Sequence, residues 1–316
     1  MIIGIVVAFV AHLLVPLWFT VGLWRGRFES KVSWLASVLG FGSYIFYISL
    51  AGAGWHLVSY YFRIAVPVAF LCAIYVSFRR VSRAGLPWWR RPGSLGGWAS
   101  LSSKALLAFF FAWSAVLAAQ SFAYGDLRAA ELSFPLRGGV WHMVHGGNSP
   151  TLNHHNVDVT QRFALDVVKL NSAGTRALGA YPSDPESYAA FGEEITSPCS
   201  GEVITAEDGL PGLRPPEADR ENLAGNHVMV RCGGVDPEVD VLLAHMMEGS
   251  VTVDPGEEVE EGQLLGRVGN SGNTSEPHLH IHAVKSGSGE SVLEGEGVPL
   301  RFDGRFLVRN SLVFRE

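Results

Sequence analysis

Four long apolar stretches in the first 127 residues constrain the fold more than any other feature of the sequence. They cover about residues 2–24, 34–55, 60–78 and 105–124. Each is close to the roughly 20 residues that a helix needs to cross a bilayer. The only Asp, Glu, Lys or Arg within them is Arg63, whose long side chain can reach the membrane surface. The sequence therefore predicts an all-α transmembrane region of four helices over residues 1–127.

Charge divides the chain into two parts and predicts an orientation. Residues 1–127 carry a net charge of +8 and residues 128–316 a net charge of −14. The basic residues of the first part gather in the loop after the first stretch and in the loop between the third and fourth stretches, namely Arg25, Arg27, Lys31, Arg79, Arg80, Arg83, Arg90, Arg91 and Lys104. The positive-inside rule assigns both loops to the cytoplasm. We therefore expect both termini, and all of residues 128–316, to be extracytoplasmic.

Residues 128–316 have the sequence pattern of a mainly-β domain. Short β-branched or alternating runs at 201–206, 227–232, 239–244 and 279–284 are separated by Gly, Pro, Asn and Asp, as expected for strands joined by tight turns. Residues 170–194 and 207–226 lack periodicity and are predicted to be inserted loops. The acidic composition argues against a nucleic-acid partner, which would require a cationic surface.

Histidines mark the candidate site. Nine of the eleven lie after residue 128, and imidazole is both a frequent zinc ligand and the usual acid–base group near neutral pH. His278, His280 and His282 alternate on a predicted strand, so their side chains should point to one face of the sheet. Three imidazoles on one face indicate a polar or metal-binding cleft. We expect His142, His145 and His227 to be ordinary surface or strand residues.

The last of these segments resembles a known family. Residues 269–280, GNSGNTSEPHLH, are similar to the glycine/serine turn and His-x-His strand of the lysostaphin-like zinc endopeptidases. Residues 253–269 resemble the barrel-sandwich hairpin of that family, and His245 lies where the family has the histidine of its Tyr-x-His strand. Segments 195–203 and 225–230 resemble two further strands. The resemblance covers about residues 130–300 and implies an antiparallel lysostaphin-like peptidase fold.

The resemblance implies roles for the histidines and one bound zinc ion. His280 corresponds to a zinc ligand, and His245 and His278 correspond to the catalytic histidines. The upstream ligand pair of the family is matched by His155 and Asp166, because the run Gln-Arg-x-Ala-x-Asp that ends at Asp166 resembles a branch with an insertion between the two ligands. His154 with Asp158 is the alternative, since this pair has the commoner His-x-x-x-Asp spacing.

Three ligands suit a catalytic zinc, which keeps one position open for water. His245 and His278 are then available to move protons and to stabilise charge on the substrate oxygen, although the sequence does not decide which is the base. Asn153, His154, Gln161 and His282 are candidates for the outer shell that orients metal ligands.

Cys199 and Cys232 form a candidate disulfide. Antiparallel pairing of the strands 201–206 and 228–232 with a constant residue sum of 431 would place the two cysteines opposite each other. An extracytoplasmic domain can keep such a pair oxidised, and a reduced buried pair is the alternative.

The resulting hypothesis is an integral protein of a bacterial cytoplasmic membrane with a zinc endopeptidase domain outside the cell membrane. Its expected partners are a peptidoglycan peptide or an extracytoplasmic protein as substrate, membrane lipid, and a regulatory protein that the sequence does not identify. The alternative is a non-catalytic zinc-binding or activator module that regulates cell-wall hydrolases.

Overall fold

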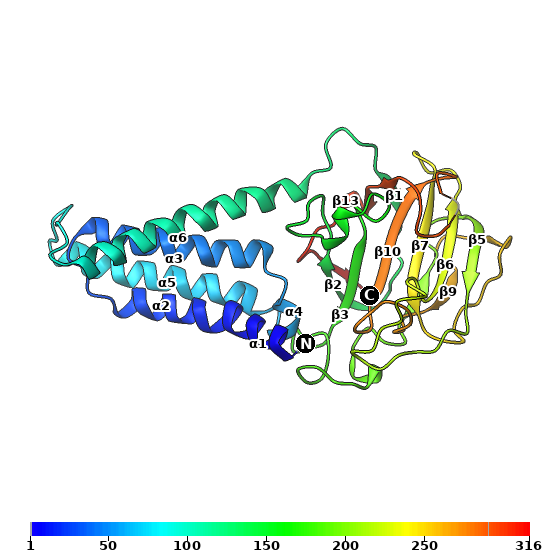
Figure 1. Cartoon of the computed structure of the whole chain (residues 1–316), viewed down its shortest axis with the longest axis horizontal. Helices are drawn as coiled ribbons and strands as arrows, with labels where there is room; N and C mark the ends of the chain where they lie inside the picture. Colours follow the sequence, from blue (N-terminus) through cyan, green and yellow to red (C-terminus); the bar gives the residue numbers. More distant parts are fainter. Residues whose placement is uncertain (1, 290) are drawn as a thin grey trace. The chain divides into compact units, whose positions relative to one another are not determined.

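The protein, described here from a computed structural model over residues 2–289 and 291–316, divides into two compact units, Ile2–Ala119 and Gln120–Glu316. The first is all-α and the second is mainly β, as predicted (Figure 1). The division falls eight residues before the predicted boundary, because the chain leaves the last long helix at Ala119.

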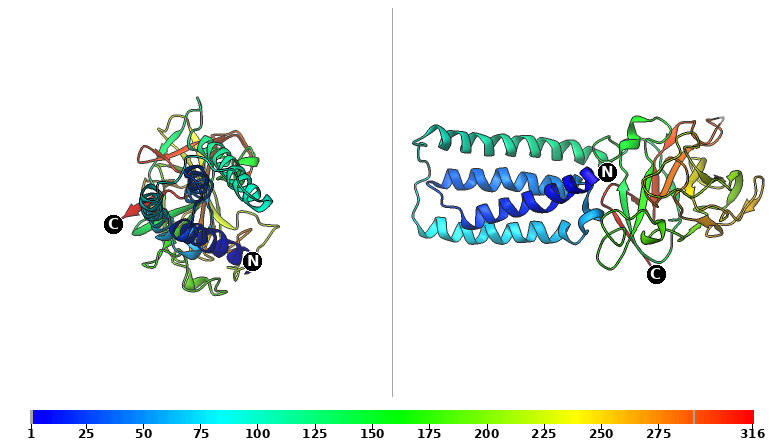
Figure 2. Two further views of the ribbon diagram at one scale, coloured as in Figure 1. Left: turned by 90° about the vertical axis from the view of Figure 1, so that its left-hand side faces the viewer. Right: turned by 60° about the horizontal axis from the view of Figure 1, so that its bottom comes forward.

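Four helical segments of the first unit are long and apolar enough to cross a membrane. The helices of this unit are α1 (Ile2–Phe9), a π-helical turn (Val10–Leu14), α2 (Val15–Arg25), α3 (Lys31–Ala51), α4 (Trp55–Val58), α5 (Phe62–Arg83) and α6 (Leu95–Ala119). The first three of these form one continuous span, and all four spans run side by side in the views of Figure 2.

The boundaries of the spans follow local chemistry. Helix α3 begins after Ser30, whose side chain accepts the backbone N–H of Ser33 in a capping box. Helix α6 begins ten residues earlier than predicted, because Lys104 lies inside the helix and not before it. At this level α3 and α6 approach closely: a Cβ at Gly40 would lie 2.6 Å from the carbonyl oxygen of Lys104. A small residue here is therefore what lets the two backbones pack.

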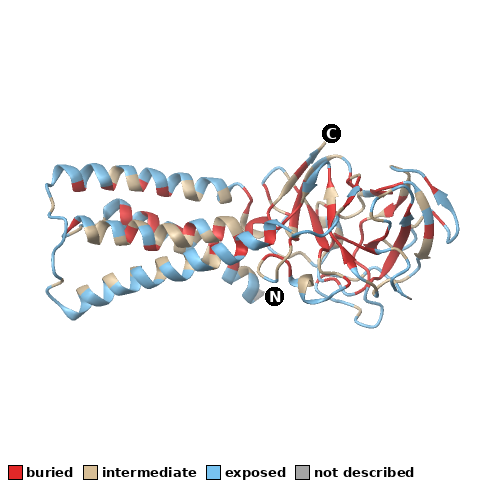
Figure 3. Cartoon of the chain, turned by 90° about the horizontal axis from the view of Figure 1, so that it is seen from above, coloured by how far each residue is buried: buried red, intermediate tan, exposed pale blue. Residues whose placement is uncertain are grey.

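The outer surface of this helical unit is apolar. Large side chains such as Phe109, which is 72% exposed, and Trp18, which is 70% exposed, have no protein cover, and Figure 3 shows exposed residues along the length of the helices. Water would solvate such a surface poorly, whereas lipid tails would cover it at no cost. This burial pattern is compatible with a membrane anchor.

The second unit is built on one nine-stranded sheet with the order β14-β2-β3-β10-β7-β6-β5-β8, to which β11 adds beside β10. Every pair within it is antiparallel. Its strands are β2 (Gly139–His145), β3 (Leu165–Leu170), β5 (Gly201–Glu207), β6 (Asn226–Cys232), β7 (Val239–Met246), β8 (Glu258–Val259), β10 (Leu279–Lys285), β11 (Gly297–Val298) and β14 (Leu312–Arg315). Two small sheets complete the unit: β1 (Ala130–Leu132) with β12 (Leu300–Phe302) and β13 (Arg305–Phe306), and β4 (Glu194–Thr196) with β9 (Leu264–Arg267).

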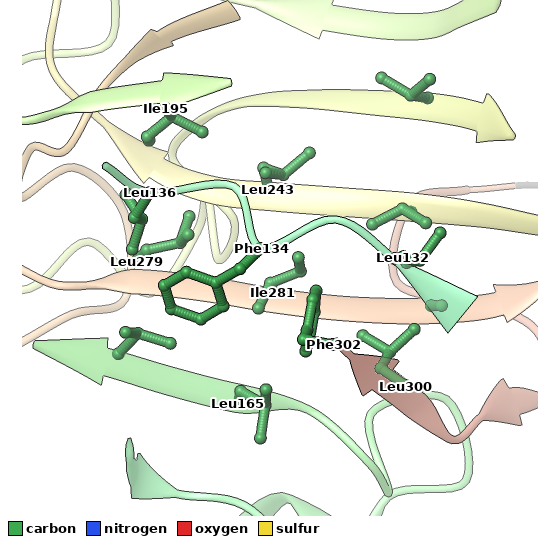
Figure 4. Close-up of a cluster of buried hydrophobic side chains, with 14 of the residues drawn as sticks. Leu132, Phe134, Leu136, Leu165, Ile195, Leu243, Leu279, Ile281, Leu300 and Phe302 are labelled. Carbon is green, nitrogen blue, oxygen red and sulfur yellow. The ribbon is translucent and has the colours of Figure 1, made fainter. Parts of the chain in front are cut away.

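Apolar side chains cover the middle of the sheet. Figure 4 shows Leu243, Ile281 and Phe302 within the main cluster, and a second cluster that includes Leu242 and Ala244 packs separately. Strand β7 is buried along its whole length, which explains its central apolar run 241–244. The central strands, where the site lies, are thus rigidly held.

The segment 253–269, predicted to be a hairpin, has its two arms in different sheets. Strand β8 pairs with β5 and strand β9 pairs with β4. The loops predicted at 170–194 and 207–226 contain within their interiors only one short 3₁₀ turn, Pro185–Ser187.

Cys199 and Cys232 are joined in a disulfide, with their Cα atoms 5.6 Å apart. The register used to predict this pair is wrong by two residues, because Cys232 lies opposite Gly201 in the β5–β6 ladder. Cys199 precedes the strand, and the chain turns there so that Gly233 N–H bonds the Ser200 carbonyl. The turn brings the two thiols together although the strand pairing does not.

We expect replacement of both cysteines by serine to lower the free energy of unfolding of the β domain by about 3–4 kcal/mol, the effect of opening a loop of this length. Pulse proteolysis of the full-length protein across a urea series measures this change. The control is Cys72→Ser, which removes an exposed cysteine of the helical unit. Equal resistance of the wild type and the double variant would contradict the prediction.

Candidate metal centre and active site

Asp166 is the centre of the site. It lies on β3 directly opposite His280 of β10. Its Oδ1 is 2.9 Å from His280 Nδ1, and its Oδ2 is 2.9 Å from His155 Nε2. Candidate ligand atoms of these three residues all lie within 4.8 Å of one another. The sheet register thus brings Asp166 and His280 together, and His155 joins them from outside the sheet.

His155 reaches the site from a short 3₁₀ turn, His154–Val157. Buried Asn153 holds this turn: its Oδ1 accepts the His155 N–H, and its Nδ2 donates to the carbonyls of Gly147, Arg162 and Ala164. Asn153 therefore ties the turn to the chain leading into β3. It thereby fixes the backbone at His155.

His245 and His278 face the same cavity from two other elements, and each is anchored by one ring nitrogen. His245 Nδ1 lies 2.9 Å from the Ser271 carbonyl oxygen, and His278 Nδ1 lies 2.8 Å from the Glu276 carbonyl oxygen. A carbonyl oxygen only accepts, so both Nδ1 atoms carry the proton. A neutral His245 ring therefore leaves the lone pair of Nε2 available. His278 Nε2 lies 3.5 Å from Asp166 Oδ1, and this nitrogen donates to the carboxylate when the ring carries both protons.

The backbone of His245 is strained. Its φ is +63°, in the left-handed region that few non-glycine residues adopt. Its N–H bonds the Ala224 carbonyl, and its own carbonyl accepts the N–H of Gly269. These contacts hold a conformation that costs of the order of 1–3 kcal/mol, and such residues concentrate at functional sites.

The pKa values of the clustered residues are shifted in different directions. Burial opposes ionisation of Asp166, but the charge and hydrogen bond of His155, with hydrogen bonds from His278 and His280, hold the pKa of this carboxyl well below its usual range. Burial lowers the pKa of His280 to about 4, and burial with the charge of His278 lowers the pKa of His245 well below normal. For His278 burial is outweighed by Asp166, which raises its pKa. Asp166 is thus anionic, and His245 and His280 are neutral, near pH 7.

This donor set fits zinc. Zn–N and Zn–O bonds of about 2.0–2.2 Å require ligand atoms a few ångströms apart, as those of His155, Asp166 and His280 are. Neutral imidazoles and a carboxylate are the protonation states that bind a metal. His282, buried beside the site, has Nδ1 3.0 Å from His280 Nε2, which suits it to fix the orientation of His280. Contacts of this kind to the second ring nitrogen of a ligand histidine fix the ring that binds the metal.

Of the alternative ligand pair, His154 and Asp158, only His154 belongs, among the described residues, to a group that could hold a metal. Asp158 bonds the Thr160 N–H and belongs to neither of the His/Cys/Asp/Glu groups able to hold a metal that the described residues form. His154 forms a second group with His145 and the same Asp166. Arg309 Nη2 lies 3.2 Å from His145 Nδ1, and a guanidinium only donates, so this nitrogen is not free for a metal. Gln161 lines a cavity beside the site, and no described bond joins it to His155, Asp166 or His280.

The sequence interpretation of three histidines as ordinary surface or strand residues holds for two of them. His142 lies on β2 and His227 on β6, both buried, with bonds to Asn310 Oδ1 and the Gly225 carbonyl respectively. His145 instead lines the cavity, and burial lowers its pKa to about 3. The sequence feature that could have indicated this position is the glycine pair 146–147, which directly follows His145 at the end of β2.

Two cavities of about 250 Å³ and 290 Å³ open on either side of the cluster. They share His154, His155, His245, Asn273 and His280 and therefore adjoin at the cluster; the two together are called the groove below. The first is otherwise lined largely by polar residues, Thr274, Ser275 and Glu276 among them. The second has apolar walls that include Val157, Leu223, Leu242 and Leu293.

Residues 186–292 match the family model described as peptidase family M23. Over this part the chain is similar to peptidase family M23. The match confirms the resemblance seen in the sequence, and it supports a peptidase role. It includes His245, His278 and His280 but begins after His155 and Asp166. Strand β3 and the turn before it bring these two residues to the same point. No curated protein matches the chain.

Solved structures similar to this chain include three with different descriptions. The catalytic domain of lysostaphin from Staphylococcus simulans is 20% identical, with 38% of this chain and 84% of that chain covered and a TM-score of 0.23. A putative M23 peptidase from Pseudomonas aeruginosa is 20% identical, with 55% and 53% covered and a TM-score of 0.27. The SpoIIQ–SpoIIIAH pore-forming complex is 18% identical, with 39% and 57% covered and a TM-score of 0.25. This chain spans little more than half the length of the latter two.

Proposed function

We propose that the protein is a membrane-anchored zinc metalloendopeptidase that hydrolyses peptide bonds in peptidoglycan cross-links. The observation that carries the proposal is the convergence of His155, Asp166 and His280 with the Nε2 atoms of His245 and His278 on one groove. A zinc ion bound by the three ligands would polarise the scissile carbonyl and acidify water.

His245 and His278 supply the proton transfers of this reaction. Nε2 of one ring accepts the proton of the attacking water, and the other ring donates a hydrogen bond to the substrate oxygen or a proton to the leaving amine. The raised pKa of His278 favours the donor role for this ring, and the lowered pKa of His245 favours a neutral ring that accepts. The carbonyls of Ser271 and Glu276 keep both rings aimed at the groove during these transfers.

The two halves of the groove suit a peptide with different side chains on the two sides of the cleaved bond. The half beside Leu223 and Leu242 favours an apolar side chain. The half beside Glu276 and Ser275 favours a polar or cationic one. A peptide with this asymmetry fits better than a uniform run of glycine.

The test is incubation of the full-length protein, in detergent, with purified peptidoglycan. We expect new amino termini to appear, and mass spectrometry of the released fragments identifies the cut bond. Zinc binding without any cleavage of peptidoglycan or extracytoplasmic protein would contradict an enzyme, and it would favour a non-catalytic module that regulates other hydrolases.

The peptidoglycan substrate depends on orientation. We propose that the loops 26–30 and 84–94, with their flanking basic residues, face the cytoplasm, because together these regions hold most of the positive charge of the helical unit. Both termini and the β domain then lie outside.

An accessibility experiment checks this topology. A single cysteine introduced at Glu316, in a chain whose Cys72 is replaced by serine, should react with a membrane-impermeant maleimide in intact cells. A cysteine introduced at Ser94 should react only after lysis. The reverse labelling pattern would place the domain in the cytoplasm and remove peptidoglycan as a substrate.

A further inference from the structure

The inserted segment 171–192 packs against the chain that leads into the site. As far as the structure describes the groove, none of the residues lining the two cavities comes from this segment. It instead contacts the turn 269–276, which leads directly into His278 and β10. The segment therefore does not obstruct the groove, and its contacts with the turn give it a different role.

Arg176 makes the principal contact. It is only 1% exposed, and its Nε donates to Glu276, 2.8 Å from Oε2 and 3.0 Å from Oε1, while Nη2 donates to the Ala180 carbonyl. Its guanidinium lies against the rings of Tyr181 and Tyr188, at 5.6 Å and 5.5 Å. A charge is buried so deeply only where its partners are well fixed.

Tyr181 makes a second contact with the same turn. Its hydroxyl donates to the Ser275 carbonyl at 2.6 Å. The hydroxyl of Tyr188 bonds the Pro182 carbonyl, within the segment itself. Two tyrosines flank one arginine, and only the hydroxyl of Tyr181 bonds the turn among the described contacts, while the more deeply buried Tyr188 bonds within the segment.

The turn transmits these contacts to the site. The Glu276 carbonyl accepts the Nδ1–H of His278, and Thr274 Oγ1 lies 3.1 Å from the same nitrogen. A shift of the Glu276 backbone would therefore rotate the His278 ring and move its Nε2. Ser275 and Glu276 also line the polar half of the groove.

The other inserted segment holds the opposite end of the turn. Leu213 and Asn270 exchange two hydrogen bonds, and Asp219 N–H donates to the Gly272 carbonyl. Gly272, with φ +81°, lies so close to Gly225 that a Cβ would be 2.4 Å from its nitrogen. At the other end Thr274 Oγ1 donates to the Glu276 carbonyl from within the turn. The segment 171–192 adds the contacts of Arg176 and Tyr181 from outside the turn.

We propose that the segment 171–192 is a positioning element for the active site, in which Arg176 and Tyr181 fix the Ser275–Glu276 backbone and, through it, the ring of His278. This role rests on the proposed function only in taking His278 as a proton-transfer group. The geometry of the turn itself is independent of catalysis.

The experiment compares Tyr181→Phe with Tyr188→Phe in the full-length protein. Tyr181→Phe should lower kcat between about tenfold and about 100-fold, the upper value being the cost of a 1 Å misplacement, with KM and zinc content unchanged. Hydrogen exchange of the peptide covering residues 273–278 should become faster. Tyr188→Phe should match the wild type in all four measurements.

Arg176→Met extends the test, with Arg128→Met as a control because Arg128 pairs with Asp236 on the surface. Arg176→Met should increase exchange in 273–278 more than Tyr181→Phe does. If it fails to fold, the tyrosine pair still decides the question. Equal exchange and equal kcat for the two tyrosine variants would overturn the positioning role. Absence of cleavage by the wild type would overturn the proposed function alone, since hydrogen exchange would still report on the turn.

Discussion

Asp166→Asn is expected to remove zinc binding and peptidase activity together. The substitution keeps the shape of the side chain, but it removes the anion that lies 2.9 Å from both His155 Nε2 and His280 Nδ1. Loss of an outer-shell partner alone typically weakens metal binding 10–100-fold, so loss of a ligand should cost at least about 100-fold. Cleavage should fall to background at zinc concentrations that saturate the wild type.

Asp158→Asn is the matched control, because it makes the same change eight residues away, at the carboxyl of the alternative ligand pair. It should leave the zinc affinity within about twofold of the wild type, because among the described bonds the Asp158 carboxylate accepts the Thr160 N–H and contacts none of the three ligands. A competition titration with a chromophoric chelator measures both variants. A larger effect of Asp158→Asn than of Asp166→Asn would show that the assignment of the carboxylate ligand is wrong.

His245→Ala is expected to separate catalysis from metal binding. Its Nε2 is free to act on substrate because Nδ1 is bonded to the Ser271 carbonyl, and the side chain is not one of the three ligands. Loss of a positioned acid–base group costs between about 10² and 10⁴ in rate. The variant should therefore bind zinc like the wild type, with kcat lowered by about that factor.

The control for this variant is His227→Gln, which changes a buried histidine of β6 that lines neither of the two cavities among the described residues. Its zinc content and kcat should stay near those of the wild type. Zinc content by mass spectrometry and initial rates of cleavage measure the outcome. Loss of zinc in His245→Ala would contradict its separation from the ligands.

The sequence predicted the central strands well, because their residues carry local information. The predicted strands at 227–232, 239–244 and 279–284 differ from β6, β7 and β10 by two residues or fewer at each end. The pattern of buried apolar residues alone was sufficient there. Strand β2, in contrast, was not recognised as the neighbour of β3, because its glycine and histidines hide the apolar alternation.

Long-range contacts account for most of what the sequence did not predict. Arg176 and Glu276 are 100 residues apart in the chain, and a single sequence gives no signal that an arginine in a long loop is fully buried. The proximity of His145 and Arg309 is likewise set by the sheet edge, where Arg309 follows the β12–β13 hairpin. Resemblance to a family, in contrast, singled out the residues around Asp166 because their order along the chain is itself distinctive.

The most direct test of a zinc peptidase site is to measure metal content and peptidoglycan cleavage side by side for the wild type and His280→Ala. The wild type should contain one zinc per chain and release new amino termini, and His280→Ala should contain little zinc and release none. A wild-type protein without zinc, or a His280→Ala protein that cleaves as fast as the wild type, would contradict the site described here.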